Sequence, residues 1–258
     1  MGLLDDAVVF ISGGTRGLGA GIARAAVSAG GAVVVTGRRA DIGNAFVQEV
    51  RGGGGEATFV ACDAGDLEQT RAAFAAGLSE YGRIDCLVNN AGQTSRGSLV
   101  DTTPELFDAH IAVNLRAPFF LMQDFVRARL DAKLPGTVVN IVSFSQHAGQ
   151  PYLTPYVAAK AGLAGLTRNA AHAHRWDRIR INGLNIGWTA SEGEDDTQRA
   201  FHDAGPDWRE RAAQKLPMGK LGQVDEIADF VVFLLSDRSG VVTGSVIDWD
   251  QNVLGGLD

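Results

Sequence analysis

Cysteine is scarce in this sequence: the 258 residues include only two, Cys62 and Cys86. Both lie inside apolar runs typical of strands, so we expect two buried free thiols. Cysteine and histidine do not recur at the spacing of metal ligands, and no metal site is expected. No apolar run reaches the length of about 20 residues that a membrane-spanning helix needs.

Positive charge is also in deficit, because 23 Lys and Arg face 30 Asp and Glu and give a formal net charge of −7 at pH 7. An excess of negative charge repels polyanions and favours solubility, which argues against a nucleic-acid partner. The first residues lack the basic and then apolar layout of a signal peptide. Together these features predict a cytoplasmic protein with neither a nucleic-acid nor a membrane partner.

No repeat, linker or low-complexity segment divides the chain, so we expect a single domain, 1–258, with a large core. Short apolar runs rich in β-formers alternate with helical patterns. Strands are expected at 7–11, 32–36, 57–61, 84–88, 137–142, 179–185 and 245–249, and helices at 22–27, 40–50, 67–81, from 103 onward as one long helix, 155–174 and 224–235. This alternation predicts an α/β fold with a doubly wound parallel sheet and helices on both faces.

A glycine-rich turn follows the first expected strand and precedes the first expected helix. It runs Ser12-Gly13-Gly14-Thr15-Arg16-Gly17-Leu18-Gly19. Strand, glycine-rich turn and helix form the context of a dinucleotide-binding fingerprint. Glycines let the backbone approach a pyrophosphate, which the free N–H groups and the positive end of the helix then hold.

Tyr156 and Lys160 lie four residues apart, so on a helix they share one face. An unperturbed phenol has a pKa of about 10, and a nearby ammonium lowers it. The hydroxyl of Ser143 is placed to hydrogen-bond the substrate oxygen whose proton the phenol takes or gives. These residues form an acid/base device for carbonyl–alcohol chemistry, although a tyrosine and a lysine at this spacing also occur on ordinary helix surfaces.

In combination these motifs resemble the short-chain dehydrogenase/reductase family over nearly the whole chain. The matching residues are Gly13, Gly17 and Gly19, the Asn89-Asn90-Ala91-Gly92 run, Ser143, and the pair Tyr156 and Lys160. The resemblance implies a Rossmann-type fold and an NAD(P)-dependent oxidoreductase that interconverts a secondary alcohol and a ketone. It implies that Tyr156 is the acid/base, that Lys160 lowers its pKa and binds the nicotinamide ribose, and that Ser143 orients the substrate oxygen. Asn114, inside the long helix, would join the lysine to a proton relay through water.

The resemblance also implies a set of cofactor-binding residues. They are Gly13, Thr15, Arg16, Gly17, Leu18, Gly19, Arg38, Asp63, Ala64, Asn90, Ala91, Gly92, Tyr156, Lys160, Gly187 and Thr189. Asp63 would bind the adenine, although an aspartate after a strand also suits a turn. Either Thr189 or Ser191 would supply a hydroxyl near the nicotinamide.

Two places depart from the family pattern. Ile186 stands where relatives usually have proline before Gly187, and Trp249-Asp250 stands where they usually have Gly-Gly. The path of the loop and of the final turn must therefore differ from the usual one.

The end of the second expected strand predicts which dinucleotide is bound. Gly37 stands where NAD-binding folds of this type usually place an acid, and Arg38 and Arg39 follow it. A guanidinium binds a 2′-phosphate through charge-assisted hydrogen bonds, and Arg16 is placed to reach it from the opposite side. NADP is therefore expected, while NAD is usable if Arg38 only stacks on the adenine.

The segment 191–218 is polar, and the family uses this segment as a mobile lid over the substrate, although a solvated insertion has the same composition. Ser145, Gln150 and Trp188 are the predicted substrate residues, with His147, Tyr152 and His202 as further candidates. This mixed polar and aromatic set favours a sugar, a polyol or a similar hydroxylated small molecule. The alternatives are a 3-oxoacyl-thioester reductase and a catalytically silent nucleotide sensor on the same fold.

A homotetramer is expected from the apolar residues of two helices. The helix that begins at Pro104 carries Phe107, Ile111, Leu115 and Phe119, more than one sheet face requires, and relatives pair it and the Tyr156 helix across a two-fold axis. Self-complementary patches of this kind commonly give closed symmetric assemblies. Light scattering at micromolar concentration should therefore give the mass of four chains; the mass of one chain would contradict the prediction.

Overall fold

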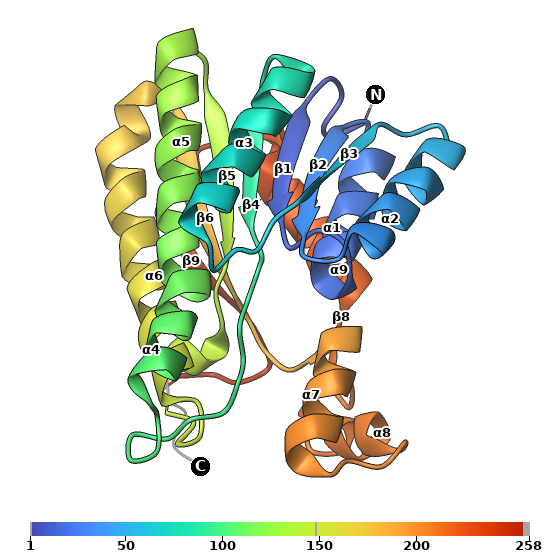
Figure 1. Ribbon diagram of the computed structural model, residues 1–258, viewed down its shortest axis with the longest axis vertical. Coiled ribbons are helices and arrows are strands. Elements are labelled where there is room, and N and C mark those ends of the chain that lie inside the picture. The colour runs from blue at the N-terminus through green and yellow to red at the C-terminus, as the bar shows by residue number, and fades with distance from the viewer. Residues whose placement is uncertain (1, 148, 255–258) are drawn as a thin grey trace.

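A seven-stranded parallel sheet forms the centre of the protein in the computed structural model, which describes residues 2–147 and 149–254 (Figure 1). Its strands run in the order β3-β2-β1-β4-β5-β6-β9. Their bounds are β1 Val8–Ser12, β2 Ala32–Gly37, β3 Ala57–Ala61, β4 Cys86–Asn89, β5 Gly136–Ile141, β6 Ile179–Ile186 and β9 Val246–Trp249. The order reverses between β1 and β4, and ligands of open α/β sheets bind in the crevice at such a point.

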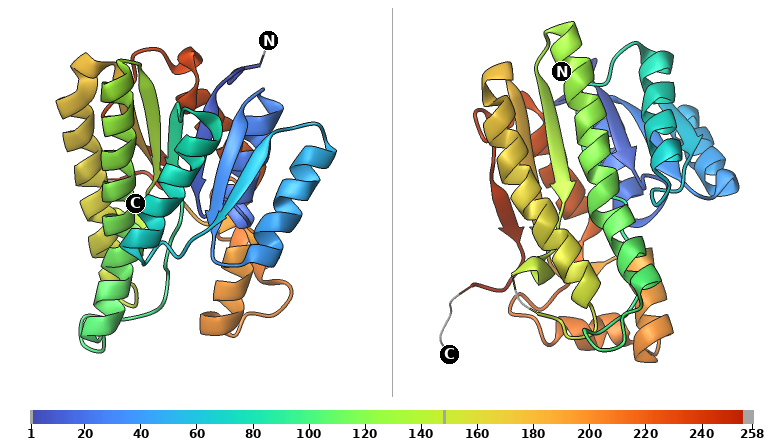
Figure 2. Two further views of the ribbon diagram at one scale, coloured as in Figure 1. Left: turned by 45° about the horizontal axis from the view of Figure 1, so that its top comes forward. Right: turned by 60° about the vertical axis from the view of Figure 1, so that its left-hand side comes forward.

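Helices cover both faces of the sheet (Figures 1 and 2). One face carries α1 Gly17–Ser28, α2 Ala40–Gly52 and α9 Val224–Leu235, and the other carries α3 Leu67–Tyr81, α5 Ala117–Ala132 and α6 Thr154–His174. In β1, Val9 and Ile11 pack into one core, and Val8 and Phe10 pack into the other. Neighbouring side chains of a strand point to opposite faces, so a strand covered on both faces is apolar throughout. The predicted doubly wound α/β fold is confirmed.

The helix predicted to begin near Thr103 begins there but is not continuous. It consists of α4 Pro104–Ile111, a π-helical turn Ala112–Arg116, and α5. The Thr103 side chain caps α4 and Pro104 lies in its first turn, as predicted. The prediction of one regular helix is wrong because the amide of Asn114, in the π turn, hydrogen-bonds the backbone of Gln93. Single π turns of this kind frequently mark functional sites.

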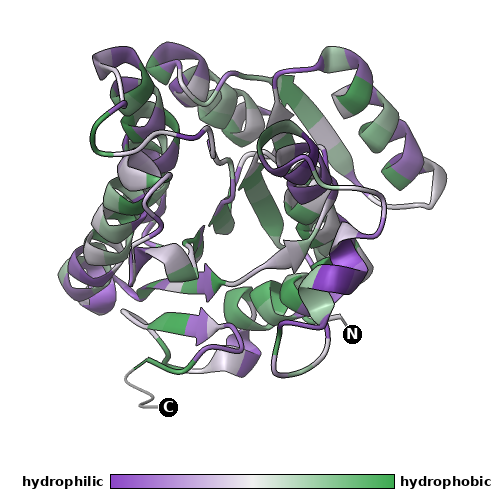
Figure 3. Ribbon diagram, turned by 90° about the horizontal axis from the view of Figure 1, so that it is seen from below, coloured by the Kyte–Doolittle hydropathy of each residue, from purple (hydrophilic) through white to green (hydrophobic). Residues whose placement is uncertain are grey.

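The segment 191–218 contains two helices whose bounds the sequence did not predict. They are α7 Glu192–His202 and α8 Trp208–Ala213, and at the base of the segment β7 Thr189–Ala190 pairs with β8 Gly222–Gln223. α7 buries none of its side chains, so it lacks the apolar stripe by which a helix is predicted. α8 is held by Trp208, which packs with Ala212 and Leu221 in a small separate core. Both helices project beyond the carboxyl ends of the strands (Figure 1). In Figure 3, which shows the molecule from below, the largely hydrophilic α7 lies toward the viewer.

The two departures from the family pattern change the end of the sheet. Ile186 continues β6 and pairs with Trp249, and the Gly187 N–H donates to the Trp249 carbonyl at 3.2 Å. Glycines leave space for the side chains of Asp250 and Trp249. A Cβ on Gly187 would lie 2.2 Å from the Asp250 carboxylate, and one on Gly222 would lie 2.9 Å from the Trp249 ring.

Both cysteines are buried free thiols, as predicted. Burial raises the pKa of the Cys86 thiol to about 12, so it is unreactive at neutral pH. Within residues 2–147 and 149–254, no helix combines the length and the hydropathy of a membrane span.

Candidate active site

A cavity of about 1930 Å³ opens at the carboxyl ends of the strands, between the sheet and the segment 191–218. Small-molecule sites commonly occupy about 300–1,000 Å³, so this cavity has room for a dinucleotide and a substrate together. It is lined by Gly13, Thr15, Arg16, Gly17, Leu18, Gly19, Arg38, Asp63, Ala64, Asn90, Ala91, Gly92, Ser143, Ser145, Gln150, Tyr156, Lys160, Gly187, Trp188 and Thr189. Asn114, predicted as a catalytic residue, and His147, a further substrate candidate, are not part of this lining.

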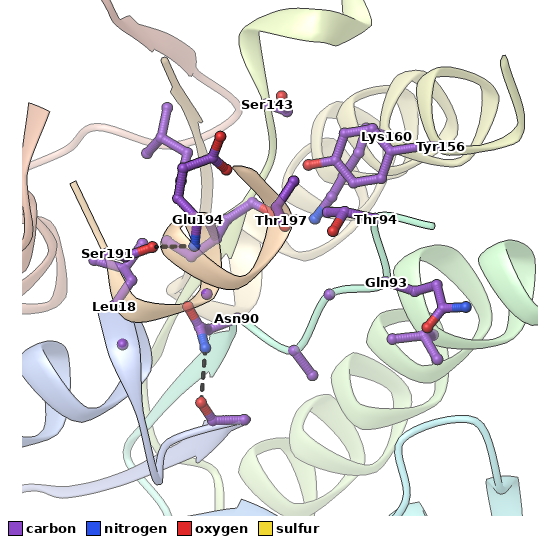
Figure 4. Close-up of a pocket in the computed structure, with 18 of the residues that line it drawn as sticks. Leu18, Asn90, Gln93, Thr94, Ser143, Tyr156, Lys160, Ser191, Glu194 and Thr197 are labelled. Carbon is purple, nitrogen blue, oxygen red and sulfur yellow. Dashed lines mark hydrogen bonds between the residues drawn. The ribbon is translucent and has the colours of Figure 1, made fainter. Parts of the chain in front are cut away.

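The glycine-rich turn between β1 and α1 forms a cradle that side chains would fill. Gly13 and Gly17 have φ angles of +66° and +53°, which favour glycine. A Cβ on Gly19 would lie 2.1 Å from the Gly13 carbonyl oxygen and 2.5 Å from Asn90 Nδ2. Asn90 fixes the turn by donating to the carbonyls of Ser12 at 3.2 Å and Gly13 at 2.9 Å (Figure 4). The cradle fits a pyrophosphate at the N-terminus of α1.

The far end of the cavity carries the residues predicted to bind adenosine. Asp63 lines it, and its Oδ1 accepts a hydrogen bond from the Gly65 N–H at 2.9 Å, so the aspartate also shapes the turn. A Cβ on Gly37 would lie 2.5 Å from Thr15 Oγ1, which leaves no room for an acidic side chain at that position. Arg38 is exposed at the cavity wall, and within the described parts of the chain no carboxylate pairs with it.

Arg16 points toward the segment 191–218. Its guanidinium lies 2.5 Å from the Asp196 carboxylate and 3.8 Å from that of Glu192, both on α7. The arginine predicted to reach a 2′-phosphate therefore joins the glycine-rich turn to α7.

Tyr156 and Lys160 lie one turn apart on α6, as the spacing predicts, and Ser143 follows the end of β5 (Figure 4). The ammonium of Lys160 lies 5.7 Å from the centre of the Tyr156 ring. It is buried and donates to the Ile141 carbonyl at 2.7 Å. The last residue of β5 thus holds the lysine beneath the tyrosine.

The lowering of the Tyr156 pKa by Lys160 stays a prediction, because Lys160 is not among the groups that shift this pKa in the polypeptide by itself. Burial raises the pKa of Tyr156 above its ordinary value, and a hydrogen bond with Ser143 offsets only part of the rise. Burial also lowers the pKa of Lys160 to about 8. Desolvation disfavours the charged form of both groups.

Asn114 is held by a buried histidine that the sequence did not single out. Its amide exchanges two hydrogen bonds of 3.0 Å with the backbone of Gln93, and its Nδ2 lies 3.3 Å from His110 Nδ1. His110 Nε2 lies 3.0 Å from the Ser95 carbonyl. A carbonyl only accepts, so Nε2 carries the proton and Nδ1 accepts from Asn114. The His110 ring also meets the Tyr156 ring edge-on, with centroids 6.2 Å apart. The sequence could have indicated this contact, because His110 lies four residues before Asn114 and therefore on the same face of a helix.

The predicted substrate residues Ser145 and Gln150 form one chain of hydrogen bonds with Ser143. Ser143 Oγ donates to Ser145 Oγ at 3.1 Å, and Ser145 Oγ donates to Gln150 Oε1 at 2.9 Å. His147, a further candidate, does not line the cavity. It lies against Asp248 of β9, with its Nε2 2.7 Å from the carboxylate.

The segment 191–218 closes the cavity from the other side. Trp188 donates from Nε1 to the Glu194 carboxylate at 2.9 Å and stacks on Trp208. Ser191 accepts from the Glu194 N–H and so caps α7 (Figure 4). Thr189 donates to the Gly187 carbonyl at 3.0 Å. Both residues line the cavity, so the choice between the two hydroxyls stays open.

Comparisons with known proteins agree with this site. Residues 13–252 match the family model described as enoyl-(acyl carrier protein) reductase. L-rhamnose 1-dehydrogenase (NAD(P)(+)) of Azotobacter vinelandii is 33% identical over 94% of each chain. The 3-oxoacyl-[acyl-carrier-protein] reductase FabG of Thermotoga maritima is 32% identical over 97% of this chain and 99% of its own. The crystal structure of a single-residue variant of actinorhodin polyketide ketoreductase with NADPH superposes with a TM-score of 0.90, at 27% identity over 97% of this chain and 98% of the other. The chain therefore belongs to the short-chain dehydrogenase/reductase family of NAD(P)-dependent oxidoreductases.

Proposed function

We propose that this enzyme interconverts a secondary alcohol and a ketone on a small hydroxylated substrate, with NADP(H) preferred over NAD(H). The reaction type is inferred from one observation. Ser143, Tyr156 and the buried Lys160 line the same cavity as the glycine-rich turn that would hold the dinucleotide. A silent nucleotide sensor has no use for this acid/base set.

Tyr156 carries the proton in the proposed mechanism. In the oxidation direction its oxygen takes the proton of the substrate hydroxyl, and in reduction it returns that proton. A bound nicotinamide dinucleotide supplies the hydride acceptor or donor. Ser143 holds the substrate oxygen beside the phenol. Lys160 keeps a positive charge beneath the ring, which favours the phenolate when it forms, and offers N–H groups to a ribose hydroxyl.

The substrate class is inferred from the polar groups around Tyr156. Ser145, Gln150, Thr94 and Glu194 offer hydroxyl, amide and carboxylate groups in the same part of the cavity. Such groups suit a hydroxylated compound, and the relative named L-rhamnose 1-dehydrogenase supports a sugar or polyol. The relative named 3-oxoacyl-[acyl-carrier-protein] reductase keeps a 3-oxoacyl thioester as the alternative.

A screen of sugars, polyols and simple secondary alcohols with NAD and with NADP tests this function at the nicotinamide absorbance band. Reduction of 3-oxoacyl thioesters is measured in the same plates. Turnover of hydroxylated compounds is the expected result. Tight dinucleotide binding without turnover of any alcohol or ketone would indicate a sensor instead.

Arg38→Asp should weaken NADP far more than NAD. A guanidinium binds a 2′-phosphate through strong charge-assisted hydrogen bonds, whereas a carboxylate repels it. The substitution is placed at 38 because Thr15 excludes a side chain at 37. The measurement is kcat/KM for both dinucleotides, with Arg24→Asp, a change of equal charge outside the cavity, as the control. An unmutated enzyme that already prefers NAD would contradict the assignment.

The homotetramer is likewise a proposal. Phe107 of α4 and Phe119 of α5 are 44% and 43% exposed, on helices that lie beside α6 at the edge of the molecule (Figures 1 and 2). Exposed aromatic side chains on such helices favour a contact between copies of the chain.

A further inference from the structure

Arg96 is a cation inside the cavity that neither the sequence motifs nor the proposed mechanism uses. It lies on the loop between β4 and α4 and lines the cavity together with Tyr156, Gln150 and Tyr152. Its charge acts on the reaction centre, because it lowers the pKa of Tyr156. A substrate that touches Tyr156 therefore extends into the field of this guanidinium.

The guanidinium is held in a fixed orientation. Arg96 Nη1 donates to the Thr94 carbonyl at 2.9 Å. The rings of Tyr152 and Phe201 lie on it with centroids 5.2 and 5.1 Å from its central carbon. Two aromatic faces and a backbone carbonyl remove most of the side-chain freedom that binding would otherwise cost.

This guanidinium has donors to spare and only a neutral side-chain partner. Arg96 Nη2 lies 2.9 Å from His202 Nε2, and since arginine only donates, the neutral imidazole accepts. Nε is shielded from solvent and has no hydrogen-bond partner. In the described parts of the chain no carboxylate lies within 4.0 Å of Arg96, whereas Arg16 in the same cavity is paired with Asp196. A buried charged donor without an acceptor is costly and marks a place for one.

We propose that Arg96 binds the carboxylate of the substrate, so that the enzyme acts on a hydroxy acid and the corresponding oxo acid. This inference rests on the proposed alcohol–ketone function and names its substrate class. The carboxylate takes the place of the His202 ring at the Nε and Nη2 edge of the guanidinium and accepts two parallel N–H bonds. Phe201 and His202 are both on α7, so its movement exposes or covers this edge.

The charges nearby favour a carboxylate over a phosphate. Glu194 lines the same cavity, and its negative charge raises the pKa of Tyr156. A doubly charged phosphate would be repelled by this carboxylate, while one guanidinium neutralises a singly charged group. Glu194 accepts hydrogen bonds from Trp188 and Gln198 at Oε1, and its carboxylate does not lie within 4.0 Å of the Arg96 guanidinium.

The test compares straight-chain oxo acids having one to four carbons between the ketone and the carboxyl carbon with their methyl esters. The ester keeps the reacting carbonyl and the chain but removes the charge. At least one acid should exceed its ester in kcat/KM by about tenfold to a hundredfold, the value of a hydrogen bond between charged groups. Arg96→Gln should abolish that advantage by raising KM for the acid much more than for the ester, whereas any effect through the pKa of Tyr156 changes kcat for both alike and cancels from the ratio.

Arg211→Gln is the matched control, because Arg211 carries the same charge, lies on α8 and does not line the cavity. It should leave both acid and ester kinetics unchanged. Equal turnover of every acid and its ester by the wild type would overturn the proposal. An equal loss for acid and ester in Arg96→Gln would also overturn it, since that result assigns Arg96 to holding α7.

A binding measurement separates this inference from the proposed function. Trp188 lines the cavity, so tryptophan fluorescence should report titration of the protein with 4-oxopentanoate, with its methyl ester and with inorganic phosphate. The acid should bind in the wild type and about tenfold or more weakly in Arg96→Gln, with the ester and phosphate binding weakly to both. If no alcohol or ketone is turned over, the proposed function fails, but this titration still shows whether Arg96 binds a carboxylate. Stronger binding of phosphate than of the acid would refute the carboxylate assignment.

Discussion

Tyr156→Phe is expected to lower kcat by about 100-fold to 10,000-fold, the usual worth of a general acid or base. Phenylalanine keeps the ring and its edge contact with His110 and removes only the oxygen that carries the proton. Dinucleotide affinity should stay close to that of the wild type, because the glycine-rich cradle is untouched. Steady-state kinetics and a fluorescence titration with NADPH measure the two effects.

The control for this variant is Tyr81→Phe. Tyr81 Oη lies 3.2 Å from Thr58 Oγ1 and the residue does not line the cavity, so the same chemical change there should leave kcat near the wild-type value. A Tyr156→Phe enzyme that retains more than about a hundredth of wild-type kcat would contradict proton transfer by this residue.

The sequence predicted best the elements whose pattern of buried side chains is regular along their whole length. Every side chain of β1 is buried, so a continuous apolar run is enough to identify it, and the helix bounds Leu67–Tyr81 and Val224–Leu235 match the prediction. The cavity lining was also predictable in large part. The ends of parallel strands meet at one edge of a sheet, and residues there converge whatever the details of the helices.

The features that the sequence did not predict depend on contacts between distant segments. Arg96 lies 106 residues before His202, and no local pattern indicates that a loop arginine and a histidine of α7 meet. The π turn depends on Asn114 reaching Gln93 across a loop, so residue periodicity gives no sign of it. The bounds of α7 were missed because it packs no apolar stripe against the sheet.

The Tyr156 pKa shows a different limit of sequence reasoning. The spacing of Tyr156 and Lys160 correctly placed a positive charge one turn away, but the size of its effect depends on burial. Burial raises the pKa of the phenol and lowers the pKa of the amine to about 8, in each case against the charged form. Tyr156 and Lys160 are therefore held in an environment that disfavours their charged forms, so we expect that removing the lysine changes stability as well as activity.

Lys160→Met is expected to abolish most turnover and to weaken dinucleotide binding, because the charge beneath Tyr156 and the N–H groups for the ribose disappear together. Methionine fills a similar volume, so the fold should persist.

Burial lowers the pKa of Lys160 from 10.5 to about 8, which means that the unfolded chain binds this proton more tightly. The folded wild type therefore carries a penalty of about 3 kcal/mol below pH 8, offset by the hydrogen bond to Ile141, worth about 1–3 kcal/mol.

The wild-type penalty disappears as pH rises from about 8 to 10.5, because the unfolded state binds more protons than the native state over this interval. The methionine variant has no such group. Its free energy of unfolding relative to the wild type should therefore be highest near pH 7 and fall as pH approaches 10. Urea unfolding of both proteins without dinucleotide, at pH 7, 8.5 and 10, measures this difference. A difference that is the same at all three pH values would show that the lysine is not held in a desolvated site, and the two roles assigned to it would then have to rest on contacts with the substrate and the ribose alone.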